Sequence, residues 1–143
     1  ILLLFFTSGC GYSPIFSSKN SNFSIYELSS SGDIKLNKII DGKLNNYKGS
    51  SGSKKFSLKM ETFLNKEIAS KDTKGNPKTY RISLKSNISI QDLNKNIKKK
   101  SFFKSVDYNN RSNKSELKKY ESEISKNLAE KISEEIIIYL QSI

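Results

Sequence analysis

Three stretches of the chain place apolar residues at every second position, and this alternation constrains the fold more than any other feature. The first runs from 56 to 68, with Lys66 on the apolar face and Phe63 on the opposite face as its exceptions. The others run from 80 to 90 and from 102 to 108. Period two is typical of strands with one buried and one solvated face. The turn sequences at 69–78 and 93–96 can join antiparallel neighbours, so we expect a meander that needs a covering layer.

Two helical patterns can supply that layer. Ser31 or Asp33 can cap the first helix and residues 112–115 the second. Apolar residues spaced by three and four positions form one stripe in each segment, namely Leu36, Ile39, Ile40, Leu44 and Tyr47, and then Leu117, Tyr120, Ile124, Leu128, Ile132, Ile136, Tyr139, Leu140 and Ile143. The second stripe fits a protein core, and a coiled-coil partner is the alternative.

A strand at 23–28, ended by the segment Ser29–Asp33, precedes the first helix. The expected fold is therefore an α/β (α+β) two-layer sandwich of order β-α-β-β-β-α. Its four-stranded sheet is mixed but mostly antiparallel, and both helices lie on one face. Residues 23–143 are expected to form a single domain.

The start of the chain has a different character. Residues 1–6 are apolar but too few to cross a bilayer, which takes about 20. Thr7, Ser8 and Gly9 then lead to Cys10, and this run resembles a bacterial lipobox. We therefore expect residues 1–9 to be the remnant of a signal peptide and residues 10–22 to be a lipidated N-terminus and linker, with the lipid on Cys10. The alternative is a buried strand with an inert cysteine.

The composition excludes several kinds of chemistry. The chain has no histidine and one cysteine, so it cannot supply a zinc site of the usual type or a Ser-His-Asp triad. Its glycines at 49 and 52 lie in serine-rich sequence and not in a phosphate-binding loop. We expect a protein that is not an enzyme and has no cofactor beyond the covalent lipid.

The net charge of +11 is carried almost entirely by lysine, since only Arg81 and Arg111 are arginine. A surface of this charge attracts anions such as phosphate groups. The candidate phosphate contacts fall in two clusters, Lys71, Lys74 and Lys78 in the first meander turn and Lys98, Lys99 and Lys100 at the start of the last strand. Two alternatives stay open, namely an AT-rich codon bias and lysines that block pairing at a strand edge.

Two short motifs resemble a known family. Cys10, Gly11, Tyr12 and the run Pro14, Ile15, Phe16 are similar to the mature start of LPS-assembly lipoproteins of the LptE family, alphaproteobacterial members above all. Tyr108-Asn109 before a long last helix, and Leu128-Ala129 within it, resemble the family's C-terminal part.

The resemblance implies a lipoprotein that is anchored in the outer membrane and faces the periplasm. Such a protein plugs an LptD-like barrel and helps to insert lipopolysaccharide in the outer leaflet. The implied partners are the barrel, lipopolysaccharide and the membrane, and not nucleic acid.

Two other functions use the same residues. A nucleic-acid-binding domain would place the lysines on phosphates and stack bases on Tyr80, Phe102 or Phe103. The scarcity of arginine and the export signal argue against it. A lipoprotein that pilots another outer-membrane complex is the second alternative.

Overall fold

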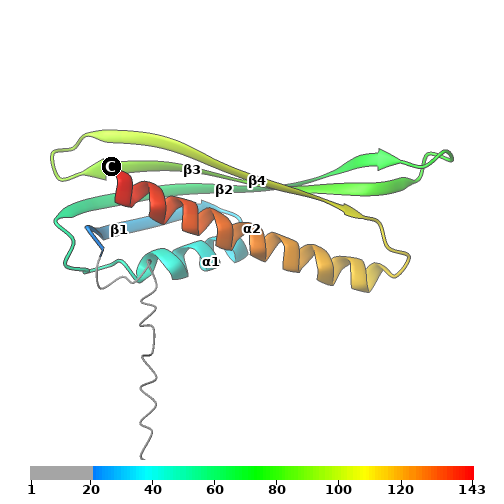
Figure 1. The fold of residues 1–143 in the computed structure, drawn as a ribbon, viewed down its shortest axis with the longest axis horizontal. Coiled ribbons are helices and arrows are strands. Elements are labelled where there is room, and N and C mark those ends of the chain that lie inside the picture. The colour runs from blue at the N-terminus through cyan, green and yellow to red at the C-terminus, as the bar shows by residue number, and fades with distance from the viewer. Residues whose placement is uncertain (1–20) are drawn as a thin grey trace, which may run out of the picture.

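The computed structural model describes residues 21–143, so the expectations for Cys10, for the signal remnant and for most of the linker lie outside the described residues. Six elements follow one another along the chain (Figure 1), β1 Phe23–Gly32, α1 Ile34–Asn45, β2 Lys54–Lys71, β3 Pro77–Asp92, β4 Ile97–Asn109 and α2 Lys114–Ser142. This order is the predicted one.

The strands form one mixed sheet of order β1-β2-β3-β4. β1 pairs with β2 in parallel because α1 carries the chain back to the starting end of β1. The other two pairs are antiparallel and follow from short turns. The predicted fold class, a two-layer sandwich with a mostly antiparallel four-stranded sheet, is confirmed.

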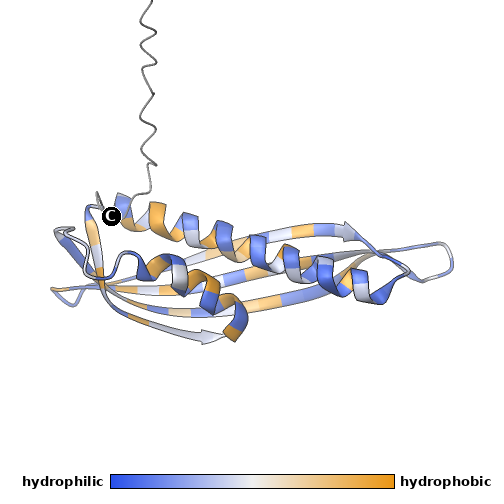
Figure 2. Cartoon of the chain, turned by 90° about the horizontal axis from the view of Figure 1, so that it is seen from below, coloured by the Kyte–Doolittle hydropathy of each residue, from blue (hydrophilic) through white to orange (hydrophobic). Residues whose placement is uncertain are grey.

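Both helices cover the same face of the sheet (Figure 2). Even-numbered residues of β2, β3 and β4 face them, and those beneath the helices, such as Leu58, Leu84 and Phe102, are buried. The stripe of α2 faces this core, with Ile132 and Leu140 fully buried, which answers the coiled-coil alternative for the described residues. No helix within residues 21–143 is both long enough and apolar enough to span a membrane.

The helix caps lie where the sequence places them. The side chain of Asp33, one of the two predicted caps, accepts a hydrogen bond from the backbone N–H of Leu36. The side chain of Asn113 does the same for α2, from Ser115 and Glu116.

The strand β1 is longer than predicted, since Ser29 to Gly32 continue it instead of ending it. Pairing with β2 outweighs the low strand propensity of serine and glycine. At Gly32 the chain comes so close to β2 that a Cβ atom would lie 2.0 Å from the carbonyl oxygen of Thr62. Glycine is needed there both for this approach and for its φ of 93°.

The hairpin of β2 and β3 extends far beyond β1. The last pair between β1 and β2 is Gly32 with Thr62, whereas β2 continues to Lys71. At about 3.3 Å per residue, this extension is about 30 Å long. We call the part of the sheet beyond Thr62 the distal half and the part that pairs with β1 the proximal half.

Candidate anion-binding hairpin tip

The turn between β2 and β3 is a compact loop organised by Asp72. Its backbone N–H donates to the carbonyl of Asn76 (2.8 Å), and Gly75 N–H donates back to the carbonyl of Asp72 (3.0 Å). One carboxylate oxygen of Asp72 accepts from the backbone N–H groups of Lys74 (2.9 Å) and Asn76 (2.8 Å). These hydrogen bonds, the one from Asn76 first, lower the pKa of Asp72 below its ordinary value. The only acid in the loop is therefore occupied by backbone groups.

Three lysines surround this loop. Lys71 ends β2, Lys74 lies in the loop and Lys78 follows Pro77 at the start of β3, and all three are exposed. None of the ion pairs in residues 21–143 includes them. We call Lys71, Lys74 and Lys78 the tip lysines. Their ammonium groups can make charge-assisted hydrogen bonds to phosphate oxygens.

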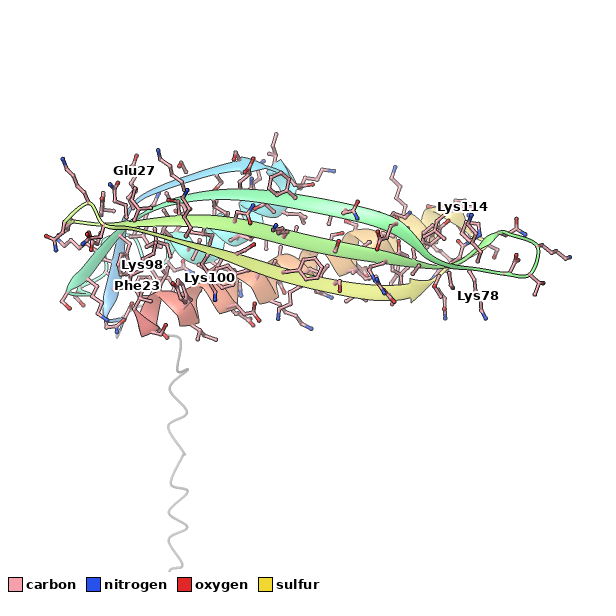
Figure 3. All side chains as sticks on the ribbon, turned by 90° about the horizontal axis from the view of Figure 1, so that it is seen from above. Phe23, Glu27, Lys78, Lys98, Lys100 and Lys114 are labelled. Atoms are coloured by element: carbon pink, nitrogen blue, oxygen red, sulfur yellow. The ribbon has the colours of Figure 1, made fainter. Side chains whose placement is uncertain are left out.

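The second predicted cluster lies at the other end of the sheet. Lys98 is opposite Ile90 on β3, and Ile90 is about 40 Å along that strand from Lys78. Figure 3 shows Lys98 and Lys100 at one end of the molecule and Lys78 at the other. The structure therefore does not bring the two predicted clusters into one site.

The surroundings of Lys98, Lys99 and Lys100 favour another role. β4 is an edge strand along its whole length, and exposed lysines hinder pairing of such an edge with other chains. The ammonium group of Lys100 lies 5.5 Å from the ring centre of Tyr139 on α2. Edge protection, one of the alternatives from the sequence, fits this cluster better than a phosphate site.

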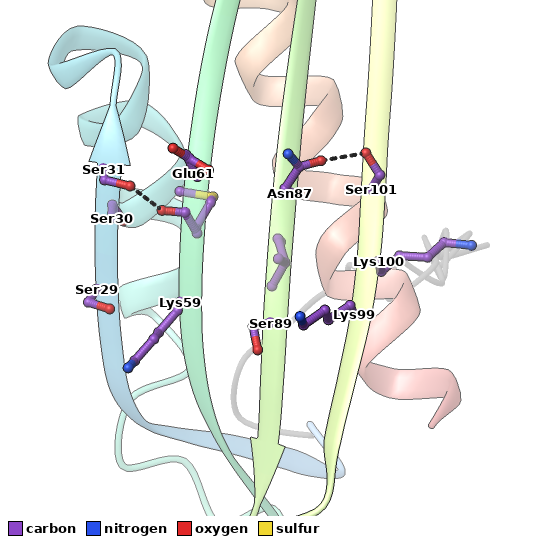
Figure 4. A pocket seen from close by; sticks show the side chains of 12 residues that line it. Ser29, Ser30, Ser31, Lys59, Glu61, Asn87, Ser89, Lys99, Lys100 and Ser101 are labelled. Atoms are coloured by element: carbon purple, nitrogen blue, oxygen red, sulfur yellow. Dashed lines mark hydrogen bonds between the residues drawn. The ribbon is translucent and has the colours of Figure 1, made fainter.

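The open face of the sheet contains a shallow groove with a volume of about 840 Å³. Serine and asparagine side chains line it together with Lys59 and Lys99 (Figure 4). Ser101 donates a hydrogen bond to the side-chain oxygen of Asn87 across it (2.7 Å). Ser29, Lys59, Lys99 and Ser101 are exposed, so this face of the sheet is solvated, as the alternation predicts.

Sequence reasoning missed a cluster that fastens the distal half to α2. The Tyr108 hydroxyl donates to a carboxylate oxygen of Glu121 (2.7 Å), and the same oxygen forms an ion pair with Lys66. The Lys66 ammonium also lies 4.5 Å from the ring centre of Tyr80, which stacks on Tyr108. We call these four residues the brace. Lys66, the exception on the predicted apolar face, could have pointed to it.

Ionisation supports the brace. Burial raises the pKa of Glu121, but the hydrogen bonds from Lys66 and Tyr108 outweigh that effect and leave this pKa below its ordinary value. Burial, followed by the hydrogen bond and charge of Glu121, raises the pKa of Tyr108. At neutral pH Glu121 is therefore a carboxylate, and Tyr108 is a neutral phenol that donates to it.

The predicted base-stacking residues are mostly occupied. Phe102 is buried in the core, and the ring of Tyr80 is in contact with Lys66 and Tyr108. Only Phe103 is exposed, on the open face. No group of three or more potential metal ligands occurs within the described residues 21–143.

Comparison with known proteins gives a likeness in structure only. No protein-family model matches the sequence, and no curated protein matches it. The fold is similar to the crystal structure of rare lipoprotein B from Shewanella oneidensis, with a TM-score of 0.66 at 19% identity over 83% of this chain and 95% of that one.

Two further solved structures share this arrangement. A minor lipoprotein from Acinetobacter baumannii has a TM-score of 0.63 at 12% identity, over 85% of this chain and 92% of that one. Lipoprotein B from Nitrosomonas europaea has a TM-score of 0.63 at 8% identity, over 85% and 86%. The chain therefore has the fold of lipoproteins of the rare lipoprotein B type.

Proposed function

We propose that the protein is an outer-membrane lipoprotein that assists lipopolysaccharide insertion from within an LptD-like barrel. Its lipid is attached at Cys10, and its tip lysines contact the phosphates of lipid A. The observation that carries this proposal is the tip itself, which presents three exposed lysines without an ion pair at the end of a long hairpin.

The position of the tip relative to the start of the domain supports the proposal. Phe23, where β1 begins, lies in the proximal half near the turn between β3 and β4. The tip is at the opposite end of the sheet (Figure 3). A chain tethered through residues before β1 can therefore hold its tip far from the tether, where a lipid carried through a barrel can meet it.

The shape of the distal half supports the same function. The hairpin ends beyond β1 and continues past the last residue of β4, because Asn109 pairs with Thr79. The tip is thus a narrow two-stranded projection. Such a projection reaches into a lumen more easily than the full width of the sheet does.

Binding of purified full-length protein to lipopolysaccharide tests the tip. The variant Lys71→Gln/Lys74→Gln/Lys78→Gln removes three charges, and the matched control Lys35→Gln/Lys38→Gln/Lys43→Gln removes three exposed charges from α1. Exposed charge pairs contribute about 0.2–1 kcal/mol each, so we expect the tip variant to bind about tenfold more weakly at low salt. The difference should shrink at high salt because of screening.

Equal binding by the tip variant and the parent would contradict the phosphate contact. The anchor is tested separately by mass spectrometry of the native protein, which should find Cys10 acylated at the mature N-terminus. Unmodified residues before Cys10 in membrane-bound protein would contradict it. Co-purification of a large barrel from detergent-solubilised outer membrane separates the proposal from a pilot lipoprotein of another complex.

A further inference from the structure

The distal half leaves one edge of β2 without a neighbouring strand. β1 pairs with β2 only as far as Gly32 and Thr62. The last backbone hydrogen bond on this edge runs from Asp33 N–H to the carbonyl of Thr62 (3.1 Å). Beyond it, residues 63–71 pair with β3 on one side only.

The direction of the backbone groups on this edge follows from the ladder. Thr62 directs its carbonyl outward, to Asp33, and backbone direction alternates along a strand. Leu64, Lys66 and Ile68 therefore also direct their N–H and carbonyl groups away from β3. On β3, the carbonyl of Lys78 accepts a hydrogen bond from the backbone N–H of Asn110. The even-numbered residues of β3 therefore direct their backbone groups toward β4, and the odd-numbered residues direct theirs toward β2. This agrees with the alternation on β2.

The free segment is regular over a useful length. The register with β3 is unbroken from 63 to 68 and shifts only between Ile68 and Ser70. It therefore offers three outward N–H and three outward carbonyl groups over about 20 Å. Among the hydrogen bonds of residues 21–143, none uses these outward groups.

The side chains along the edge favour an apolar neighbour. Leu64 and Ile68 lie on the helix-facing side of the strand and remain 41% and 46% exposed. Lys66 lies between them, but its charge is already paired with Glu121 and its ammonium covers Tyr80. This edge thus combines open backbone groups with two half-exposed aliphatic side chains and a neutralised cation.

The other edge of the sheet shows the contrast. β4 carries four lysines between Lys98 and Lys104, of which Lys104 is paired with Glu135, and lysines protect an edge from strand addition. Residues 63–68 carry one lysine, which the brace holds. The two edges are therefore unequal in their readiness to accept a strand.

We propose that the free edge at residues 63–68 binds an extended segment of the barrel partner as an added strand. The segment would carry apolar residues at alternate positions, which pack on Leu64 and Ile68. Main-chain hydrogen bonds give such contacts their affinity, and the alternate side chains give them specificity. The identity of the partner rests on the proposed function.

The test uses full-length protein that is co-expressed with the LptD-like barrel of the same genome and purified through a tag. Ile68→Pro removes one outward donor without removing a hydrogen bond to β3. Ser105→Pro is the matched control, since Ser105 is exposed and, like the other odd-numbered residues of β4, directs its N–H to the outer edge. We expect Ile68→Pro to retain at least tenfold less barrel than the parent, and Ser105→Pro to retain as much as the parent.

Two further measurements distinguish loss of the added strand from a folding defect caused by the proline. The variant Leu64→Lys/Ile68→Lys leaves the backbone intact and should lose the barrel to a similar extent. In the complex of the parent, the amide hydrogens of Leu64, Lys66 and Ile68 should exchange at least tenfold more slowly than in the free protein. The amide hydrogens of Asn65 and Glu67 should exchange slowly both in the complex and in the free protein, because they are directed toward β3.

The outcomes separate the two proposals. If the parent retains no barrel, the barrel is not the partner of this protein. The proposed function is then wrong, and so is the strand addition by a barrel segment. If the parent and all edge variants retain the barrel equally, or the three amides exchange at unchanged rates in the complex, only the strand addition is wrong. Protection of these amides in the isolated protein, rising with its concentration, would make a second copy the occupant and would overturn the proposal.

Discussion

The proximal and distal halves of the sheet both have apolar contacts with the same helix, but only the distal half adds the polar cluster of the brace. In the proximal half, α2 buries aliphatic side chains such as Ile132 and Ile136 in the same core as strand residues such as Ile88. In the distal half, the helix uses Glu121, which binds Lys66 and Tyr108. An apolar core fixes the first half by close packing. In the second half this core narrows to residues such as Ile82 and Leu84, the brace adds polar contacts, and the tip is exposed. Such a division lets a projecting hairpin stay soluble and still keep a defined direction.

The largest effect should come from the apolar core. Ile132 is fully buried, and its replacement by alanine leaves a cavity, so we expect Ile132→Ala to lower the free energy of unfolding by about 2–5 kcal/mol. Glu123→Ala, at an exposed position of the same helix, should change it by less than about 0.5 kcal/mol. Thermal melting of both variants checks this. Similar losses would mean that the stripe on α2 is not the core contact.

A smaller and more local effect should follow from breaking the brace. Tyr108→Phe removes the hydrogen bond to the Glu121 carboxylate, and hydrogen bonds to charged groups contribute about 1.5–3 kcal/mol. We expect a loss near the lower end of this range because the site is only partly buried. Amide exchange should accelerate in residues 63–71 and not in the proximal half. A uniform acceleration, or no loss compared with Tyr26→Phe at an exposed site, would contradict a local role for the brace.

The two turns at opposite ends of β3 give a third comparison. Both turns have Asp at the first of five positions and Asn at the fifth. The fourth residue has a positive φ in each, Gly75 (83°) in the tip and Lys95 (65°) in the other turn. A side chain is strained in this conformation. We expect Gly75→Ala to destabilise the protein by about 1 kcal/mol and Lys95→Gly to stabilise it by about 0.5 kcal/mol. Urea unfolding measures both, and two changes of the same sign would show that φ does not decide them.

The same turns predict a dependence on acid. Hydrogen bonds lower the pKa of Asp72, from the Asn76 backbone first, and of Asp92, from the Asn96 side chain first. When the pKa of a carboxyl group is lower in the folded than in the unfolded protein, the group stabilises the fold at a pH above its unfolded-state pKa of about 3.9. This stability is lost as the pH falls through the folded-state pKa. Asp72→Asn should therefore make unfolding less sensitive to pH between about 5 and 3. An unchanged pH profile would mean that the turn does not hold a charged carboxylate.

Much of the fold could be predicted because each strand and helix has its own repeat. The alternation in β2 and β3 and the spacing on α2 assign their buried faces correctly, and Asp33 is a cap in the sequence as in the structure. β1 was predicted too short because Ser29 to Gly32 are held by pairing with β2 and not by their own propensity. Local sequence carries no sign of such a pairing.

The candidate site was only partly predictable, for a similar reason. The lysines at 71, 74 and 78 were placed at an exposed turn, and the structure has them there. The distance between this cluster and the cluster of Lys98, Lys99 and Lys100 follows from the strand pairing, since successive turns of a meander lie at opposite ends of their shared strand. Only one part of the brace has a signal in the sequence, namely Lys66 on an otherwise apolar face. Its partner Glu121 could not be predicted, because it is 55 residues away in sequence.

The central claim is that the tip, and not the opposite end of the sheet, meets lipopolysaccharide. The most direct measurement is photo-crosslinking in growing cells, with a photoreactive amino acid in place of Lys74 or, at the other end, in place of Lys98. We expect a lipopolysaccharide adduct from position 74 and none from position 98. An adduct from position 98 alone, or equal adducts from both, would contradict it.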